Sequence, residues 1–150
     1  QVRRDPFAML PFMGYHVCDY LQHWLDIGEM TSEDKLPKIF YVNWFRKDKD
    51  GKWLWPGFGE NSRVLKWIFE RTEGAGKAVK TAIGYMPTVD ALDLQGLDVS
   101  AEDMRELLKL DKEEWLAEVA SIKEHYAKYG RMPAELQNQL KALEERVNNM

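Results

Sequence analysis

Cysteine is almost absent from this sequence: Cys18 is the only one among 150 residues. A disulfide needs two cysteines, so none can form within the chain, and nothing indicates an oxidising compartment. The sequence also lacks an apolar run long enough to cross a membrane. Its first residues include Arg3 and Arg4, but Asp5 follows directly, which does not fit a signal sequence. These absences predict a cytoplasmic protein with no membrane partner.

An excess of positive charge is missing as well. The formal net charge is -4, whereas proteins that bind nucleic acid through its phosphates need a basic surface. We therefore expect no nucleic-acid partner. The charge is unevenly distributed, because residues 35–66 are net basic and residues 90–124 are net acidic. The basic stretch would attract a phosphate-bearing ligand, but an ordinary solvated basic loop explains it equally well.

A phosphate-binding loop of the Walker type is also missing. Such a loop reads Gly, four residues, Gly, Lys, then Ser or Thr. The nearest candidate, residues 74–77, supplies Gly-Lys, but Arg71 stands at the first glycine position and Ala78 at that of the metal-binding hydroxyl. The segment fits better as a glycine-containing loop between a helix that ends near Glu73 and the apolar run 78–83.

Metal-ligating side chains are scarce. His16 and His23 lie on one face of a predicted helix, with Cys18 nearby. Two helical turns separate the histidines by about 10 Å, which is too far for one ion to bind both. We expect surface or core-edge histidines here and no metal site.

Apolar periodicity and turn signals predict alternating helical and extended segments in the first part of the chain. Residues 1–14 form an extended lead-in with Pro6 and Pro11. The predicted elements are a helix over residues 15–27 that stops at Gly28, a buried strand over 38–45, a hairpin or tight loop over 47–54 that turns at Asp50-Gly51, and a helix from Asn61 or Ser62, as its cap, to Arg71. The side chains expected to face the core are Val17, Tyr20, Leu21, Trp24 and Ile27 in the first helix, and Val64, Leu65, Ile68 and Phe69 in the second, with Trp67 at the flank.

The last third of the chain is predicted to be helical. A turn-rich connector over residues 92–99 leads to a short helix whose start, Ser100 to Asp103, is close to a capping box. A long amphipathic helix follows over 111–129 and ends at Gly130, and Pro133 begins another that ends near Met150. Their core faces are Trp115, Val119, Ile122 and Tyr126, then Leu136, Leu140, Leu143 and Val147. The fold class is therefore α/β, in the sense of mixed α+β, with a short sheet, several amphipathic helices and a helical tail.

The most unusual segment is residues 43–61, which contains five large aromatics, four basic side chains and three glycines. Aromatics interleaved with charged and turn residues are not typical of a core strand. We interpret the segment as a pocket for a purine base. Two alternatives stay open: a hairpin whose rings pack on a core, and a non-enzymatic module that binds a base or a sugar through Trp53, Trp55 and Phe58.

Three composite motifs carry a family resemblance. They are Arg-Asp-Pro-Phe-Ala-Met followed by Pro-Phe-Met-Gly-Tyr over residues 4–15, Leu-Pro-Lys-Ile-Phe-Tyr-Val-Asn-Trp-Phe over 36–45, and Trp-Pro-Gly-Phe-Gly-Glu-Asn-Ser-Arg over 55–63. On these residues the chain resembles the C-terminal part of GTP-dependent phosphoenolpyruvate carboxykinase, within its nucleotide-binding lobe. The likeness continues more loosely through residues 83–87 and the helical tail.

The resemblance implies a set of base-binding residues. In this family three aromatic rings hold the guanine, an asparagine amide lies at the edge of the base, and a glycine and a glutamate contribute backbone groups. Stacking supplies affinity but hardly distinguishes one purine from another, so discrimination needs the hydrogen bonds. The matching nucleotide-binding residues are Phe45, Trp53, Phe58, Gly59, Glu60 and Asn61.

The sequence departs from the family pattern at several positions. Trp53 stands where phenylalanine is usual, which enlarges the aromatic face and adds an N–H donor. His16, Cys18 and Met13 replace a common asparagine, glycine and phenylalanine, so we assign no substrate roles near them.

The resemblance also implies an activity for the whole enzyme: in gluconeogenesis it converts oxaloacetate and GTP into phosphoenolpyruvate, GDP and carbon dioxide, with Mn²⁺ and Mg²⁺. The phosphate loop, the metal ligands and the substrate arginines belong to upstream sequence, and the mobile lid ends just before Asp5. We expect residues 1–88 to form the guanine-pocket half and residues 89–150 a helical tail packed on it. We expect the chain alone to be inactive. We also expect it to self-associate more readily than the full enzyme, which resembles monomeric members of the family. A third reading is a structural lobe that binds ligand only within the whole enzyme.

Overall fold

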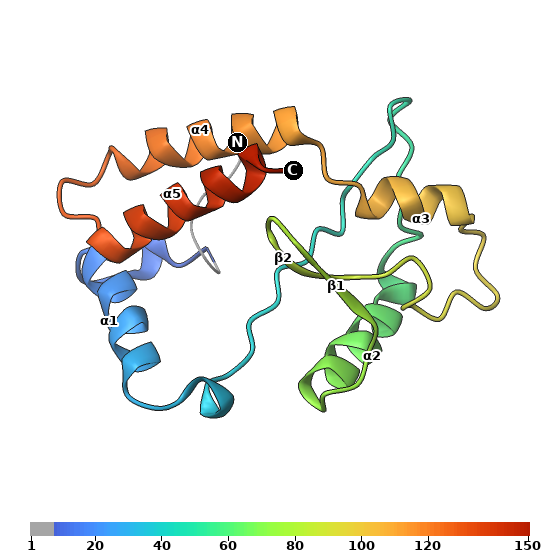
Figure 1. The fold of residues 1–150 in the computed structure, drawn as a ribbon, viewed down its shortest axis with the longest axis horizontal. Coiled ribbons are helices and arrows are strands. Elements are labelled where there is room, and N and C mark those ends of the chain that lie inside the picture. The colour runs from blue at the N-terminus through green and yellow to red at the C-terminus, as the bar shows by residue number, and fades with distance from the viewer. Residues whose placement is uncertain (1–7) are drawn as a thin grey trace. The chain divides into compact units, whose positions relative to one another are not determined.

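The computed structural model describes residues 8–150, which form two compact units (Figure 1). One unit consists of residues 38–111, and the other combines residues 112–150 with the described part of residues 1–37. The predicted lead-in around Pro6 and the end of the lid before Asp5 lie outside the described residues. The two units are bounded differently from the predicted halves, which divide the chain after residue 88. That division, and the place of the whole chain within a larger enzyme, stay predictions.

The unit that contains both described ends of the chain is helical. Its elements are the short 3₁₀ turns η2 (Leu10–Phe12) and η3 (Glu33–Lys35) and the helices α1 (Val17–Glu29), α4 (Lys112–Tyr126) and α5 (Ala134–Asn148). Within residues 8–150, no helix has the length and apolar character needed to cross a membrane. The three helices confirm the predicted ones, with small differences at their ends.

Helix α1 differs from the prediction in its end and in its buried face. It continues through Gly28 to Glu29, since a glycine can adopt helical backbone geometry at a modest entropic cost. Cys18 is its only buried side chain, and the predicted core residues Trp24 and Ile27 are exposed. The apolar stripe is therefore only partly covered, and that prediction is wrong for its C-terminal half.

Helices α4 and α5 lie side by side (Figure 1). Val119, Leu140 and Val147 are buried, as the helical spacing predicts. Lys123 of α4 donates to both carboxylate oxygens of Glu144 of α5, at 2.6 and 2.7 Å. Helix α4 ends at Tyr126, three residues before the predicted end, because a turn follows it.

The other unit, residues 38–111, carries the aromatic segment. Its elements are η4 (Phe58–Glu60), α2 (Asn61–Thr72), the strands β1 (Ala78–Thr81) and β2 (Gly84–Pro87), and α3 (Ala101–Leu108). The strands pair antiparallel, with Ala78 opposite Pro87 and Thr81 opposite Gly84. The mixed α/β fold class and the short sheet are confirmed.

The core of residues 38–111 is built from Trp55, Trp67, Leu92 and Met104. Leu92 comes from the segment predicted to be only a connector, so that segment also supplies a core residue. Helix α3 begins with a full capping box, in which the Ser100 side chain accepts from Asp103 N and Asp103 accepts from Ser100 N. The near capping box of the sequence is confirmed.

The predicted strand over residues 38–45 is wrong. Residues 38–43 have no regular secondary structure, and Trp44 and Phe45 lie in a turn. A strand needs a neighbouring strand for its backbone hydrogen bonds, and the strands of the described chain pair only with each other. Phe40 still packs edge-on against Trp67, whereas Tyr41 is 97% exposed.

Helix α2 is predicted correctly in extent, and Val64 and Ile68 pack against the core as predicted, but its cap and the rest of its buried face differ. Asn61 is its first residue, and the N-cap residue, Glu60, makes no side-chain capping bond. Trp67, which the sequence places at the flank, is buried, whereas Leu65 and Phe69 are exposed. The indole N–H of Trp67 donates to Lys77 O at 2.9 Å, so the largest side chain of the helix turns inward where its polar atom finds a partner.

The segment Gly74–Lys77 is the loop after α2, as predicted. Gly74 and Gly76 have φ values of +83° and +72°, a conformation that favours glycine. A Cβ on Gly76 would also lie 3.2 Å from side-chain atoms of Glu70 and Arg71. These glycines are therefore explained by the turn into β1.

Candidate nucleotide-base site

The aromatic segment begins with a tight hairpin. Lys47 and Trp53 form an antiparallel bridge, Asp48 N donates to Lys52 O at 2.9 Å, and Leu54 N donates to Arg46 O at 3.1 Å. The Asp48 carboxylate accepts from the backbone N–H groups of residues 50 and 52, both at 2.9 Å. Gly51 has a φ of +82°. The predicted hairpin with its Asp-Gly turn is confirmed.

The hairpin brings two of the predicted base-binding rings together. Phe45 and Trp53 meet edge to face, with ring centroids 5.9 Å apart. They are 72% and 51% exposed, and the ammonium of Lys47 lies 4.0 Å from the centre of the Trp53 ring. Stacking surface and positive charge therefore lie at one place, which suits a base that carries phosphates.

A third exposed ring follows just before α2. Phe58, in η4, is 92% exposed, and the turn before it depends on Gly57, whose φ is +116°. Gly59 has open space where a Cβ would stand. A flat ligand could reach the backbone here without meeting a side chain.

Arg63 ties this turn to the segment after β2. Its Nε donates to Glu60 Oε2 at 2.7 Å, and its other nitrogens donate to the carbonyl oxygens of Asp93 and Gln95 at 2.7 and 3.0 Å. Glu60, predicted to offer backbone groups, therefore has its side chain engaged in an ion pair. No sequence signal separates Arg63 from an ordinary basic residue on a helix surface, and the sequence prediction missed its role.

The last predicted residue, Asn61, is held by a tryptophan. Its Oδ1 accepts a hydrogen bond of 2.9 Å from Nε1 of Trp55, which is 5% exposed. Trp55 was a candidate ligand-contacting ring in the aromatic-module alternative. Its burial excludes that contact, so that part of the alternative is wrong.

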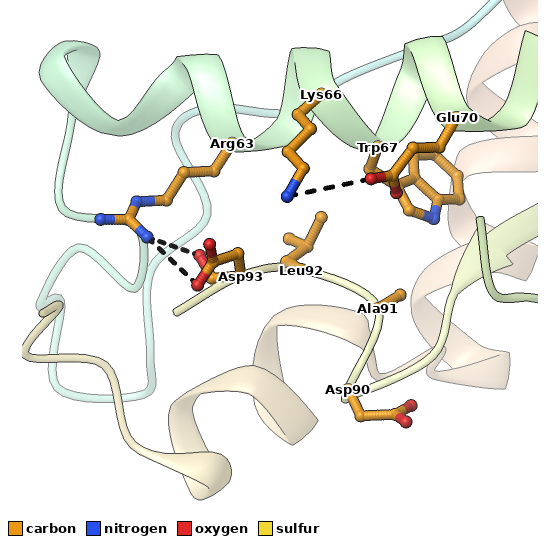
Figure 2. Close-up of a pocket in the computed structure, with 8 residues that line it drawn as sticks. All are labelled: Arg63, Lys66, Trp67, Glu70, Asp90, Ala91, Leu92 and Asp93. Atoms are coloured by element: carbon orange, nitrogen blue, oxygen red, sulfur yellow. Dashed lines mark hydrogen bonds and ion pairs between the residues drawn. The ribbon is translucent and has the colours of Figure 1, made fainter. Parts of the chain in front are cut away.

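Arg63 also lines a cleft of this unit (Figure 2). It has a volume of about 210 Å³ and is lined by Arg63, Lys66, Trp67, Glu70, Asp90, Ala91, Leu92 and Asp93. Lys66 Nζ points to Glu70 at 3.9 Å, and Arg63 reaches toward Asp93. None of the six predicted base-binding residues lines this cleft. Three of them, Phe45, Trp53 and Phe58, are exposed rings.

The charges of this cleft are largely paired with one another. Hydrogen bonds from the side chains of Lys77 and Thr88 lower the pKa of Asp90 to about 2. Asp90 is therefore ionised at neutral pH, and its carboxylate adds to those of Glu70 and Asp93. The two cations that line the cleft, Arg63 and Lys66, already pair with carboxylates and are outnumbered by three acidic side chains, so the cleft is a poor site for a nucleotide's phosphates.

In the helical unit, Cys18 and His16 have structural surroundings. Burial raises the pKa of the Cys18 thiol, which disfavours the reactive thiolate. His16 caps α1, since its Nδ1 accepts from Cys18 N at 3.1 Å. Across residues 8–150, no group of three or more His, Cys, Asp or Glu side chains is arranged to hold a metal ion.

Comparisons with known proteins agree with the motifs. A family model described as the phosphoenolpyruvate carboxykinase C-terminal P-loop domain matches residues 1–146. Proteins named phosphoenolpyruvate carboxykinase [GTP] from Treponema pallidum and Renibacterium salmoninarum are 54% and 52% identical over 150 and 147 residues. These alignments cover 99% and 97% of this chain but only 24% of each relative. The chain thus spans about a quarter of the length of the curated relatives it matches.

Proposed function

Because the chain belongs to the GTP-dependent phosphoenolpyruvate carboxykinase family, we propose that its exposed aromatic surface binds the guanine base of GTP or GDP. The proposed contact residues are Phe45, Trp53, Phe58, Gly59, Glu60 and Asn61. The observation that carries the proposal is the pairing of Phe45 with Trp53 at 5.9 Å on a hairpin that also holds Lys47. Exposed rings next to a cation are what a phosphorylated purine requires.

Each part of this surface has its own contribution to binding. The aromatic rings provide stacking, which contributes on the order of 1–3 kcal/mol per base and accepts either purine. The Asn61 amide provides hydrogen bonding to the base edge, which distinguishes guanine from adenine. Lys47 and the other basic residues of the hairpin attract the phosphates. The base surface alone should bind at about millimolar strength, roughly 4 kcal/mol, because most phosphate contacts would come from sequence outside this chain.

For the complete protein we propose the family reaction. Oxaloacetate and GTP would be converted into phosphoenolpyruvate, GDP and carbon dioxide, as a step of gluconeogenesis. A divalent cation, Mn²⁺ or Mg²⁺, would neutralise charge on the transferred phosphoryl group. The residues of this chain do not fit that ion, since no suitable ligand cluster occurs in its described part. We therefore propose that the 150-residue chain alone forms no phosphoenolpyruvate.

The proposal extends to location and assembly. We propose a cytoplasmic protein that uses guanine nucleotide and oxaloacetate or phosphoenolpyruvate, without nucleic-acid or membrane partners. The complete protein would be a monomer. The 150-residue chain would self-associate more readily, because Tyr41, Leu65 and Phe69 expose apolar surface. A mass that stays monomeric over a hundredfold range of concentration in light scattering would contradict this.

A second candidate function is an aromatic module that binds a base or a sugar without catalysis. The exposure of Trp53 and Phe58 favours it, because exposed rings can stack on either ligand. Family membership favours the nucleotide.

Ligand-detected NMR titration of the chain with guanosine, GTP and ATP tests the proposal. Guanine compounds should bind more tightly than ATP, and Phe58→Ala and Asn61→Ala should each abolish the difference or the binding. Tyr41→Ala is the matched control, because Tyr41 is 97% exposed in the same unit but lies outside the proposed site. Equal loss of binding in the Tyr41 variant, or binding of a simple sugar in preference to guanosine, would contradict the assignment.

A further inference from the structure

The side-chain amide of Asn61 has one orientation that its surroundings dictate. An indole N–H can only donate a hydrogen bond, so the Asn61 atom 2.9 Å from Trp55 Nε1 must be the oxygen Oδ1. Because Oδ1 faces Trp55, the NH₂ group of the amide is on the side away from the indole N–H. Among the described residues this NH₂ group donates to no protein acceptor, and it is not a buried unsatisfied group.

Trp55 is well suited to hold that orientation. It is 5% exposed and packs in the core with Trp67, Leu92 and Met104. A buried indole loses stability when its N–H has no partner. Rotating the Asn61 amide by half a turn would place two donors against each other and leave the indole unsatisfied. The core thus fixes which end of Asn61 faces the base.

We propose that Trp55 is a positioning residue for purine selectivity, which makes Asn61 a donor-only reader of the base edge. The inference rests on the proposed function. A donor complements a purine with a keto oxygen at position 6, as in guanine or hypoxanthine. Adenine presents an amino group there, so two donors would oppose each other. The selectivity then comes from a core contact, and the 2-amino group of guanine plays no part in this particular hydrogen bond.

Trp55→Phe tests the proposal, because it keeps an aromatic ring in the core and removes only the fixed donor. The Asn61 amide can then rotate and offer either end. The preference for guanosine over adenosine should fall roughly tenfold, because adenosine gains the hydrogen bond that the fixed donor denies it. Adenosine affinity should therefore rise, while guanosine affinity changes little. Inosine should behave like guanosine in the wild-type chain.

Trp67→Phe is a closely matched control. Trp67 is also 5% exposed, belongs to the same core cluster, and donates an indole hydrogen bond of 2.9 Å, but to Lys77 O. A general loosening of the core would lower selectivity equally in both variants. The proposal predicts a loss in Trp55→Phe alone, and equal losses would overturn it.

Hydrogen exchange of the Trp55 indole N–H separates this inference from the proposed function, because it needs no ligand. Exchange should be slow in the wild-type chain and at least tenfold faster in Asn61→Leu, while the Trp67 indole N–H is unaffected. Unchanged exchange of Trp55 would show that the contact does not exist and overturn the proposal. A chain that binds neither nucleoside would contradict the proposed function, and the exchange result would still decide whether Trp55 holds Asn61.

Discussion

Replacing Arg63 by glutamine should destabilise residues 38–111 by about 2 kcal/mol. The guanidinium makes three short hydrogen bonds, to Glu60 and to the carbonyl oxygens of Asp93 and Gln95, at 2.7, 2.7 and 3.0 Å. Its side chain is 23% exposed, so the two bonds to carbonyl groups contribute about 1 kcal/mol each and the ion pair about 0.5 kcal/mol. A glutamine side chain can retain about one of these three hydrogen bonds in a weaker form, which leaves a net loss of about 2 kcal/mol.

The measurement is urea unfolding followed by the indole N–H signals of individual tryptophans. Trp55 and Trp67 report on residues 38–111, whereas Trp24 and Trp115 report on the other unit. For a denaturant dependence of about 1–3 kcal/mol per molar urea, the midpoint of the first pair should fall by about 1 M. The midpoint of the second pair should not change.

Arg105→Gln is the matched control. Within residues 8–150, Arg105 pairs only with Glu102, three residues earlier on α3, and both side chains are largely exposed. Such a surface pair contributes about 0.5 kcal/mol or less. Equal midpoint shifts in the Arg63 and Arg105 variants would show that Arg63 does not clamp the turn at residues 57–60 to the segment after β2.

Three further predictions concern the core, acid stability and base selectivity. Met104 is fully buried, so Met104→Ala should lower the free energy of unfolding by about 2–5 kcal/mol in the same urea assay, and a loss below 1 kcal/mol would contradict its place in the core. The pKa of Asp90 is lowered to about 2, so its stabilising effect is present above its ordinary pKa near 4 and is lost as the pH falls toward 2. As the pH falls from about 4 to about 2, the free energy of unfolding of Asp90→Asn should therefore fall less than that of the wild-type chain. Identical profiles of stability against pH would exclude a contribution of the Lys77–Asp90 pair to acid stability. Asn61→Asp keeps an acceptor for Trp55 but faces the base with a second acceptor, so NMR titration should show guanosine affinity falling more than adenosine affinity; the reverse order would contradict the donor role of Asn61.

The elements that local sequence decides were predictable. The hairpin follows from an Asp-Gly turn between strand-forming residues, and helix α3 from its capping residues, because both signals lie within a few residues of the structure they specify. The buried positions of α4 and α5 follow from helical spacing. In each case the information is contained in a short stretch of chain.

Features that depend on tertiary packing, and not on a local sequence signal, were not predictable. Residues 38–45 contain strand formers, but pairing requires a partner that composition does not identify. The buried face of α2 is set by where the Trp67 indole finds Lys77 O, and the roles of Trp55 and Arg63 come from contacts to Asn61 and to residues 93–95. The six candidate residues themselves came from a motif resemblance, and their role in binding remains a proposal.

A ¹⁵N-correlated NMR titration of the chain with guanosine and with adenosine tests whether residues 45–61 form a purine-base surface. Guanosine should shift the Trp53 indole N–H, the backbone N–H of Phe58 and the side-chain NH₂ of Asn61, and leave α4 and α5 unchanged. Adenosine should cause smaller shifts at the same rings and none at the Asn61 NH₂. Shifts elsewhere in the chain, or equal effects of the two nucleosides at Asn61, would contradict the account.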